Sequence, residues 1–169
     1  MTKAPAKKKL SSSLEDYLEA ILKLEQTRRV ARTKDIARVL GVKMSSVTGA
    51  MKGLALKGLV NHDPYSFVTL TEKGKAIAGE ITMRHKALTS FFVKVLGIPP
   101  KLADENACRI EHAAGPELIE RLVRFLKFLD ECPLGDEGVM EGFRYYCKYG
   151  RVRKDCRSRI GKCRVGKNA

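Results

Sequence analysis

Two short helical patterns separated by a tight turn constrain the fold of this chain more than any other feature. The first runs from Thr33, its expected N-cap, to Gly41, which is expected to end it. The second begins near Met44 and is expected to bury Val47, Met51 and Leu54. Two helices joined by a short glycine-containing turn are typical of a helix-turn-helix.

The segments on either side extend this motif. Residues 59–62 and 66–70 are predicted strands around Asp63-Pro64-Tyr65, a hairpin that would form a wing. Before the motif, Ser12 and Glu15 have the spacing of a capping box, and a helix is expected over residues 13–26. We therefore predict a mainly α fold that begins with a winged helix-turn-helix domain at residues 12–74.

Three more helices are expected after the wing, at residues 72–96, 102–113 and 116–129, followed by a weak helical pattern after Met140. The helix at 116–129 is apolar on more than one side, which is typical of a helix that also packs on a partner subunit. We predict a second, helical domain at residues 75–131 that forms a homodimer. Basic segments at residues 1–11 and 132–169 complete the chain.

The charge of the chain is concentrated at its ends. The chain has 169 residues and a formal net charge of +14; residues 1–10 carry four Lys, and residues 144–169 carry ten Lys or Arg against one Asp. Basic ends on a nearly neutral body favour a polyanionic partner, most often nucleic acid, although two solvated tails would have the same composition. No apolar run approaches the length of a membrane span, and no secretory signal is found, so we expect a cytoplasmic protein with reduced cysteines.

The second helix of the motif is the expected DNA-reading helix. Its exposed face is predicted to carry small hydroxylated residues and cations, which are Lys43, Ser45, Ser46, Thr48, Gly49 and Lys52. Lys57 and His62 are further candidates for phosphate contacts. None of these side chains makes the bidentate base contact that Arg or Gln makes, so direct base readout is expected to be modest. The alternative is that the hydroxyls only cap the helix.

A second group of residues has the chemistry of a metal site. Asp16 and Glu19 share one helix face, Cys108, Glu111 and His112 share another, and His85 lies on the long helix. Carboxylates, imidazoles and one thiolate suit a divalent first-row metal better than calcium, magnesium or a closed four-cysteine zinc site. Taken singly, each residue also fits a plainer role: solvated carboxylates, a small buried cysteine and a surface histidine.

Four further cysteines, Cys132, Cys147, Cys156 and Cys163, lie in the C-terminal segment without a Cys-x2-Cys pair. Their possible roles are a second metal or cluster site, a redox switch, or reduced thiols among basic residues.

Residues 12–131 resemble the diphtheria toxin repressor family of metal-dependent transcriptional repressors. The resemblance rests on SLEDYLEAILKLE at 13–25, SSVTGAMKGLALKGLV at 45–60, VTLTEKGKAIA at 68–78, MRHKAL at 83–88 and ACRIEH at 107–112. It implies a homodimeric repressor, not an enzyme, that binds a palindromic operator of double-stranded DNA when metal occupies a site between the DNA-binding and dimerisation domains. Carried over residue by residue, the metal site falls on Asp16, Glu19, His85, Cys108, Glu111 and His112.

The resemblance combines two branches of the family. Cys108 matches the iron branch, whereas Asp16 and Glu19 match the manganese branch. A thiolate favours Fe(II) and added oxygen ligands suit Mn(II), so we expect Fe(II), with Mn(II) as the alternative. Thr89 and Asp104 replace the ligands of an ancillary site in the iron branch, and the SH3-like third domain of that branch is expected to be missing.

Two rival functions remain at this stage. A metalloenzyme would use Glu111 and His112 around an open metal position, but no nucleophile or general base is spaced for it. A winged-helix regulator that senses redox state through the tail cysteines would respond to oxidant and not to chelator.

Overall fold

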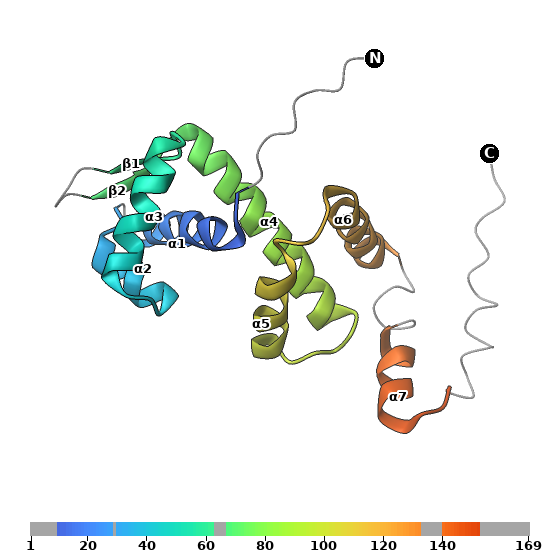
Figure 1. Ribbon diagram of the computed structural model, residues 1–169. Coiled ribbons are helices and arrows are strands. Elements are labelled where there is room, and N and C mark those ends of the chain that lie inside the picture. The colour runs from blue at the N-terminus through green and yellow to red at the C-terminus, as the bar shows by residue number, and fades with distance from the viewer. Residues whose placement is uncertain (1–9, 29, 63–66, 133–139, 153–169) are drawn as a thin grey trace, which may run out of the picture. The chain divides into compact units, whose positions relative to one another are not determined.

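The computed structural model describes residues 10–28, 30–62, 67–132 and 140–152 of the chain. Within these residues the elements are α1 (Ser12–Arg28), α2 (Thr33–Leu40), α3 (Met44–Leu56), β1 (Val60–His62), β2 (Val68–Leu70), α4 (Glu72–Lys94), α5 (Pro100–Ile110), α6 (Pro116–Glu131) and α7 (Glu141–Tyr149) (Figure 1). The prediction of a mainly α fold is confirmed. The chain divides into two compact units, residues 1–83 and 84–169, and α4 contributes to both.

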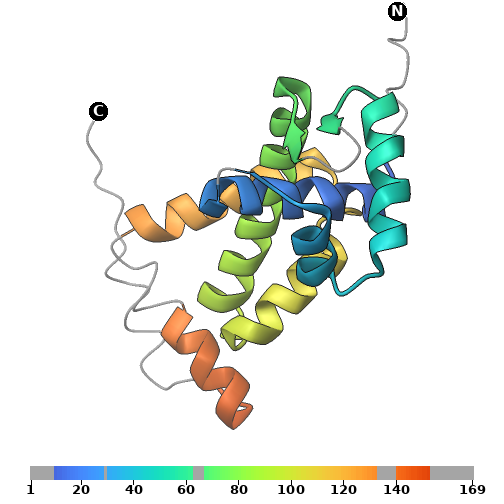
Figure 2. The same ribbon diagram turned by 90° about the vertical axis from the view of Figure 1, so that its left-hand side faces the viewer.

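The first unit is the predicted winged helix. Helices α1, α2 and α3 contact one another, and the wing contacts α1 through β2 and α3 through β1 (Figures 1 and 2). The shared core includes the predicted apolar positions of α3, which are Val47, Met51 and Leu54. Each of these three side chains is fully buried, so the opposite face of α3 is the exposed one.

The turn between α2 and α3 and the wing both have the expected local structure. Gly41 follows α2 with φ of 65°, a left-handed conformation that glycine adopts without steric cost. Strands β1 and β2 pair antiparallel, with Val60 opposite Leu70. Ala31 adds an isolated bridge to Val68, so the segment before α2 is joined to the wing. The predicted turn at Asp63-Pro64-Tyr65 lies outside the described residues.

Two predicted helix caps are wrong by one residue. The hydroxyl at the start of α1 that accepts a hydrogen bond, from the amide of Leu14, is that of Ser11 and not that of Ser12. At α2 the N-cap is Arg32, and Thr33 is already helical. At α1 two adjacent serines fit the capping rule, whereas at α2 Arg32 takes the N-cap position without a side-chain cap, so the path of the preceding chain sets where the helix begins.

A close approach of two backbones fixes the wing against α4. A Cβ built on Gly74 would lie 2.0 Å from the carbonyl oxygen of Leu59, the residue before β1. No side chain fits at this distance, so glycine is required.

The regular elements of the second unit, within its described residues, are all helices. One cluster joins the C-terminal part of α4 to α5 and α6 through Ala87, Leu88, Ala107, Ala114 and Ile119. A second cluster joins the end of α4, the end of α6 and the start of α7 through Val95, Leu129 and Met140. The helix expected at 102–113 begins earlier, at Pro100, because proline fits the first helical position. It also ends earlier, at Ile110.

Two features bear on the wider architecture. Within the described part of the chain, β1 and β2 of the wing form the one β-sheet. This part of the chain therefore contains no SH3-like barrel. No helix among the described residues is long and apolar enough to cross a membrane.

Candidate metal centre and DNA-binding surface

His85 is the centre of a hydrogen-bonded cluster in the second unit. It lies on α4, and its Nδ1 is 2.7 Å from Oε2 of Glu111. Its Nε2 is 2.9 Å from Oδ1 of Asp104 on α5. Both ring nitrogens therefore face carboxylate oxygens, and the imidazole is held at two points. An ordinary surface histidine, the plainer alternative, does not have this arrangement.

Glu111 is the most deeply buried charged residue of this cluster. It is the C-cap of α5, and its side chain is fully buried. Its second carboxylate oxygen lies 3.5 Å from Nε2 of His112, so imidazole nitrogens lie near both carboxylate oxygens. Burial of a carboxylate is costly unless cationic or hydrogen-bonding groups surround it. Glu111, His85 and His112 are the kind of donors that hold a divalent first-row metal.

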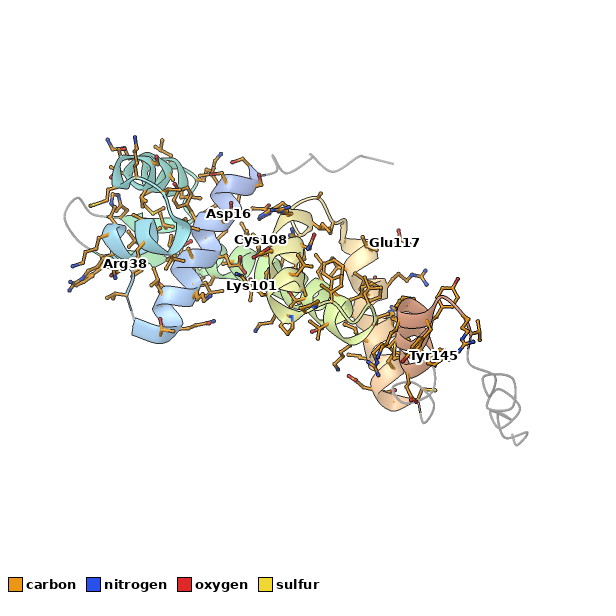
Figure 3. The ribbon with its side chains drawn as sticks, turned by 90° about the horizontal axis from the view of Figure 1, so that it is seen from below. Asp16, Arg38, Lys101, Cys108, Glu117 and Tyr145 are labelled. Carbon is orange, nitrogen blue, oxygen red and sulfur yellow. The ribbon has the colours of Figure 1, made fainter. Side chains whose placement is uncertain are left out.

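Cys108 lies on α5 one turn before Glu111, and its thiol is exposed. Figure 3 shows it on the same helix as Lys101. The alternative that Cys108 is a small buried core residue is wrong. An exposed thiol next to a buried carboxylate is available to a metal ion or an oxidant.

The two remaining predicted ligands, Asp16 and Glu19, belong to the first unit. Both lie on α1, are three residues apart, and are half-buried. Oε1 of Glu19 accepts a long hydrogen bond of 3.4 Å from the hydroxyl of Thr82 on α4. Thr82 is one helical turn before His85 on the same helix. The structure thus joins His85, Glu111 and His112 within one unit, while the full set of six ligands remains a prediction.

The predicted DNA-reading face of α3 is exposed. Its predicted contact residues Ser45, Ser46, Thr48, Gly49 and Lys52 all have exposed side chains or backbone, as does Lys43 before the helix. Thr48 donates its hydroxyl hydrogen to the carbonyl of Met44 at 3.0 Å, which leaves its oxygen as an acceptor only. A Cβ added at Gly49 would contact nothing within 4 Å. This face has few groups oriented for base readout, as expected from the residue types.

Sequence reasoning missed three features. The sequence indicates only that Asp104 replaces an ancillary ligand, because its contact with His85 depends on packing between α4 and α5. Met44, at the start of α3, is 56% exposed, and an apolar side chain there can contact a thymine methyl group. A basic cavity beside α2 was also missed, because its residues come from a turn and a helix and do not form one periodic face.

The tail cysteines are only partly described. Cys132 follows α6 and is half-buried, and Cys147 is exposed on α7. Cys156 and Cys163 lie outside the described residues, so the predicted second metal or redox site stays a prediction.

Two family models match successive parts of the chain. Residues 9–68 match the family model described as iron dependent repressor, N-terminal DNA binding domain. Residues 71–139 match the model described as iron dependent repressor, metal binding and dimerisation domain.

Individual relatives agree with the family models. The chain is 44% identical to an uncharacterised HTH-type transcriptional regulator of Methanocaldococcus jannaschii, over 72% of this chain and 99% of that protein. It is 31% identical to the HTH-type transcriptional regulator MntR of Bacillus subtilis (strain 168), over 70% of this chain and 83% of MntR.

Solved structures are similar as well. A manganese-dependent transcriptional repressor in complex with manganese superposes with a TM-score of 0.64 at 32% identity, over 68% of this chain and 53% of that one. IdeR of T. acidophilum superposes with a TM-score of 0.62 at 30% identity, over 72% of this chain and 57% of that one. The chain thus spans little more than half the length of these two repressors. With both family models matched in order, this chain belongs to the diphtheria toxin repressor family of metal-dependent transcriptional repressors, which bind DNA operators and dimerise.

Proposed function

We propose that the chain is an Fe(II)-responsive repressor of metal-ion homeostasis that binds palindromic operators as a dimer when metal is bound. The proposed ligands are Asp16, Glu19, His85, Cys108, Glu111 and His112. The observation that carries the proposal is the cluster in the second unit, where the fully buried carboxylate of Glu111 lies between the imidazoles of His85 and His112. Fixed ligands of this kind lower the entropic cost of binding an ion.

The two ring nitrogens of His85 would have different roles. Nδ1 faces Glu111, and Nε2 faces Asp104. A metal-binding histidine commonly donates its other N–H to a carboxylate, which fixes the ring and makes the binding nitrogen more basic. We therefore assign Asp104 as a positioning residue that holds the Nε2–H of His85 while Nδ1 binds metal.

Cys108 supports iron over manganese. A thiolate is a softer ligand than a carboxylate and is suited to Fe(II), whereas Mn(II) prefers oxygen ligands. The exposed position of the thiol leaves it available for coordination. The relatives named as manganese regulators, together with the carboxylates of Asp16 and Glu19, support Mn(II) as the alternative.

The proposed gating is electrostatic. Asp16 and Glu19 on α1 would repel Glu111 if all three carboxylates shared one site without a cation. A divalent ion bound by the six side chains would cancel that repulsion and couple the DNA-binding unit to the dimerisation unit. Asp16 and Glu19 would then restrict the motion of α1, so that the two recognition helices of a dimer are held at one half-site spacing. DNA would in turn strengthen metal binding by the same factor.

The metal preference is tested by exchanging one ligand. Anaerobic competition titrations measure the ratio of Fe(II) to Mn(II) affinity for the wild type, for Cys108→Glu, and for the matched control Cys147→Glu at the other exposed cysteine. We expect Cys108→Glu to shift this ratio roughly tenfold or more toward Mn(II), since a hard oxygen replaces the thiolate. Cys147→Glu is expected to leave the ratio unchanged. An unchanged ratio in Cys108→Glu would remove Cys108 from the ligand set and with it the argument for iron.

A further inference from the structure

The second strand of the wing is bonded to α1 by a side chain. The backbone amide of Leu70 on β2 donates to Oε1 of Glu25 on α1 at 2.9 Å, although the two residues are 45 positions apart in the chain. Leu70 is buried, and Glu25 is half-buried. A hydrogen bond from a backbone amide to a carboxylate is stronger than one between two neutral groups, and more so away from water. Glu25 therefore fixes β2 to one point on α1, within the first unit.

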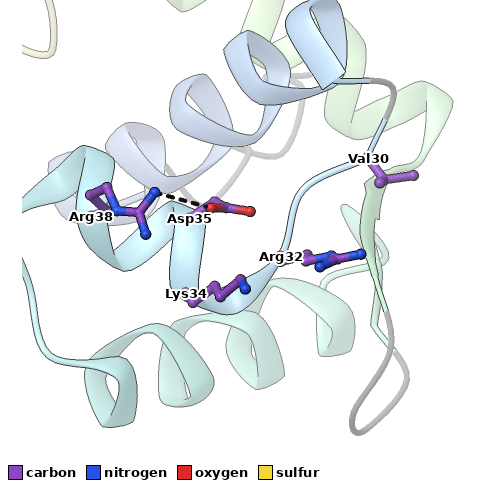
Figure 4. Close-up of a pocket in the computed structure, with 5 residues that line it drawn as sticks. All are labelled: Val30, Arg32, Lys34, Asp35 and Arg38. Atoms are coloured by element: carbon purple, nitrogen blue, oxygen red, sulfur yellow. Dashed lines mark ion pairs between the residues drawn. The ribbon is translucent and has the colours of Figure 1, made fainter.

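This hydrogen bond lies on the outer edge of β2. Val68 exchanges two backbone hydrogen bonds with Ala31, at 2.8 and 3.3 Å, on the side of the strand away from β1. Because amide directions alternate along a strand, the amide of Leu70 points to the same side as that of Val68. Figure 4 shows the turn from Val30 to Arg32, which contains Ala31, next to the wing. The outer edge of β2 is thus bonded to α1 and to the segment that follows α1.

The inner side of the wing is attached to α3 instead. The amide of Leu59, the residue before β1, donates to the carbonyl of Leu54 on α3 at 3.0 Å. The hydroxyl of Thr71, the residue after β2, donates to the carbonyl of Gly58 at 2.8 Å. The wing therefore connects α1 on one side with the proposed DNA-reading helix on the other. A shift of α1 would either break the bond to β2 or turn β2 relative to α3.

Helix α1 also carries Asp16 and Glu19, two of the proposed metal ligands. Glu19 lies six residues before Glu25, which is about 9 Å along the helix axis. The helix is continuous from Ser12 to Arg28 and contains neither glycine nor proline. Sharp bends in helices occur mostly at such residues, so α1 is expected to move as one rigid element. A displacement of Glu19 would therefore displace Glu25 as well.

We propose that Glu25 is a positioning residue that transmits the metal state of α1 to the wing. The proposal rests on the proposed function, in which a bound ion restricts the motion of α1. When α1 is held, the hydrogen bond to Leu70 keeps β2 in one orientation beside α3. When α1 is free to move, that bond opens and the wing takes several orientations. The orientation that fits DNA is then populated in a smaller fraction of the molecules, which weakens the apparent affinity for DNA.

The test compares variants at Glu25 in the full-length protein under anaerobic conditions, with Fe(II) or with chelator at one salt concentration. Glu25→Ala removes the acceptor of the Leu70 amide, whereas Glu25→Gln retains an acceptor oxygen. Gln26→Ala removes an exposed side chain at the next position of α1 and is the matched control. Three quantities are measured for each protein: Fe(II) affinity without DNA, affinity for a duplex from an iron-uptake promoter, and amide hydrogen exchange in β2.

Amide exchange reports on the wing directly and needs no variant. In the wild type, Fe(II) should slow the exchange of the Leu70 amide, because its hydrogen bond to Glu25 opens less often when α1 is held. Glu25→Ala should lose this response to Fe(II). Glu25→Gln should keep most of the response, and Gln26→Ala should keep all of it.

DNA binding should change in parallel. The ratio of DNA affinity with Fe(II) to DNA affinity with chelator is expected to fall roughly threefold to thirtyfold in Glu25→Ala, the range for residues that modulate coupling without contacting either ligand. Fe(II) affinity without DNA should stay close to the wild-type value, because Glu25 is not a proposed ligand. The ratio should be nearly that of the wild type in Glu25→Gln and unchanged in Gln26→Ala.

Three results would overturn the proposal. The first is a Leu70 amide in the wild type whose exchange does not respond to Fe(II). The second is a wild-type affinity ratio in Glu25→Ala. The third is a Glu25→Ala variant that weakens DNA binding equally with Fe(II) and with chelator, which would indicate a purely structural role for the hydrogen bond. If circular dichroism finds Glu25→Ala unfolded, the exchange of the wild-type amide decides alone.

Failure of metal gating has a different signature. The wild-type affinity for DNA would then be the same with Fe(II) and with chelator, before any variant is compared.

Discussion

The cluster around His85 and Glu111, which is the proposed metal site, and the exposed face of α3, which is the proposed DNA-reading face, differ in how their side chains are held. In the cluster, His85 contacts two carboxylates and Glu111 is fully buried. On α3, the exposed residues include the short Ser45, Ser46 and Thr48 as well as the longer Met44, Lys52 and Leu56, and Gly49 has no neighbour within 4 Å of an added Cβ. The side chains of the cluster are held in place by one another, whereas the exposed face of α3 has few oriented groups. We infer that regulation resides in the metal cluster and that DNA affinity depends largely on phosphate contacts.

The largest expected effect comes from removing a cluster ligand. His112→Ala should weaken metal binding more than roughly a hundredfold, because loss of a ligand costs more than loss of the groups that orient it. Weak, salt-sensitive DNA binding should remain, since α3 and the basic surfaces are unchanged. The measurements are metal titration and anisotropy on the same preparation. Full metal-activated DNA binding by this variant would contradict the site.

Removal of the positioning carboxylate should have a smaller effect. Asp104→Asn is expected to lower metal affinity about tenfold to a hundredfold, because an amide holds the Nε2–H of His85 less strongly than a carboxylate does. Asp130→Asn is the matched control: that carboxylate is similarly exposed but pairs with Lys94, and metal affinity should not change. If both variants bind metal equally well, Asp104 has no role in holding His85.

Substitutions at two glycines test the packing of α4 against the wing and the absence of packing on the exposed face of α3. Gly74→Ala should destabilise the first unit by about 1–3 kcal/mol, because the new Cβ would clash with the carbonyl of Leu59. Gly49→Ala should stabilise it by about 0.5–1 kcal/mol, because alanine is the better helix former and meets no neighbour. Urea unfolding of each metal-free variant gives both values. A destabilising Gly49→Ala would mean that the face is packed after all.

The smallest expected effect concerns an exposed ion pair. The hydrogen bond from Lys75 to Glu72 raises the pKa of Lys75 above its ordinary value. A raised pKa in the folded state means that the pair contributes to stability below the ordinary lysine pKa and loses this contribution as pH rises through the raised value. Glu72→Gln should lower the Lys75 pKa toward its ordinary value in an NMR titration, because the amide carries no negative charge, with little change in stability at neutral pH. A Lys75 pKa that stays raised would assign the shift to another group.

The local parts of this structure were predictable from sequence. Apolar spacing located α1 to α6 within a few residues, since the buried face of a helix recurs every three to four positions. The spacing of Cys108, Glu111 and His112 places them close together at the end of α5, and their role as metal ligands stays a prediction. The helix predictions succeeded because they depend on neighbours along one helix.

Features that depend on packing between elements were not predictable. The contact of Asp104 with His85 requires α4 and α5 to be adjacent, and the basic cavity requires Arg32, beside the wing, and Arg38, on α2, to face the same space. The exposure of Cys108 is likewise set by tertiary structure, since free cysteine is usually buried.

Metal is proposed to control DNA binding through the cluster around His85 and Glu111. The most direct test is anaerobic fluorescence anisotropy of a duplex from an iron-uptake promoter, titrated with Fe(II) and in parallel with Mn(II) at one fixed salt concentration. We predict tight binding that appears with metal, disappears with chelator, and has its lower midpoint with Fe(II). Binding that is the same with either metal and with chelator would contradict metal gating.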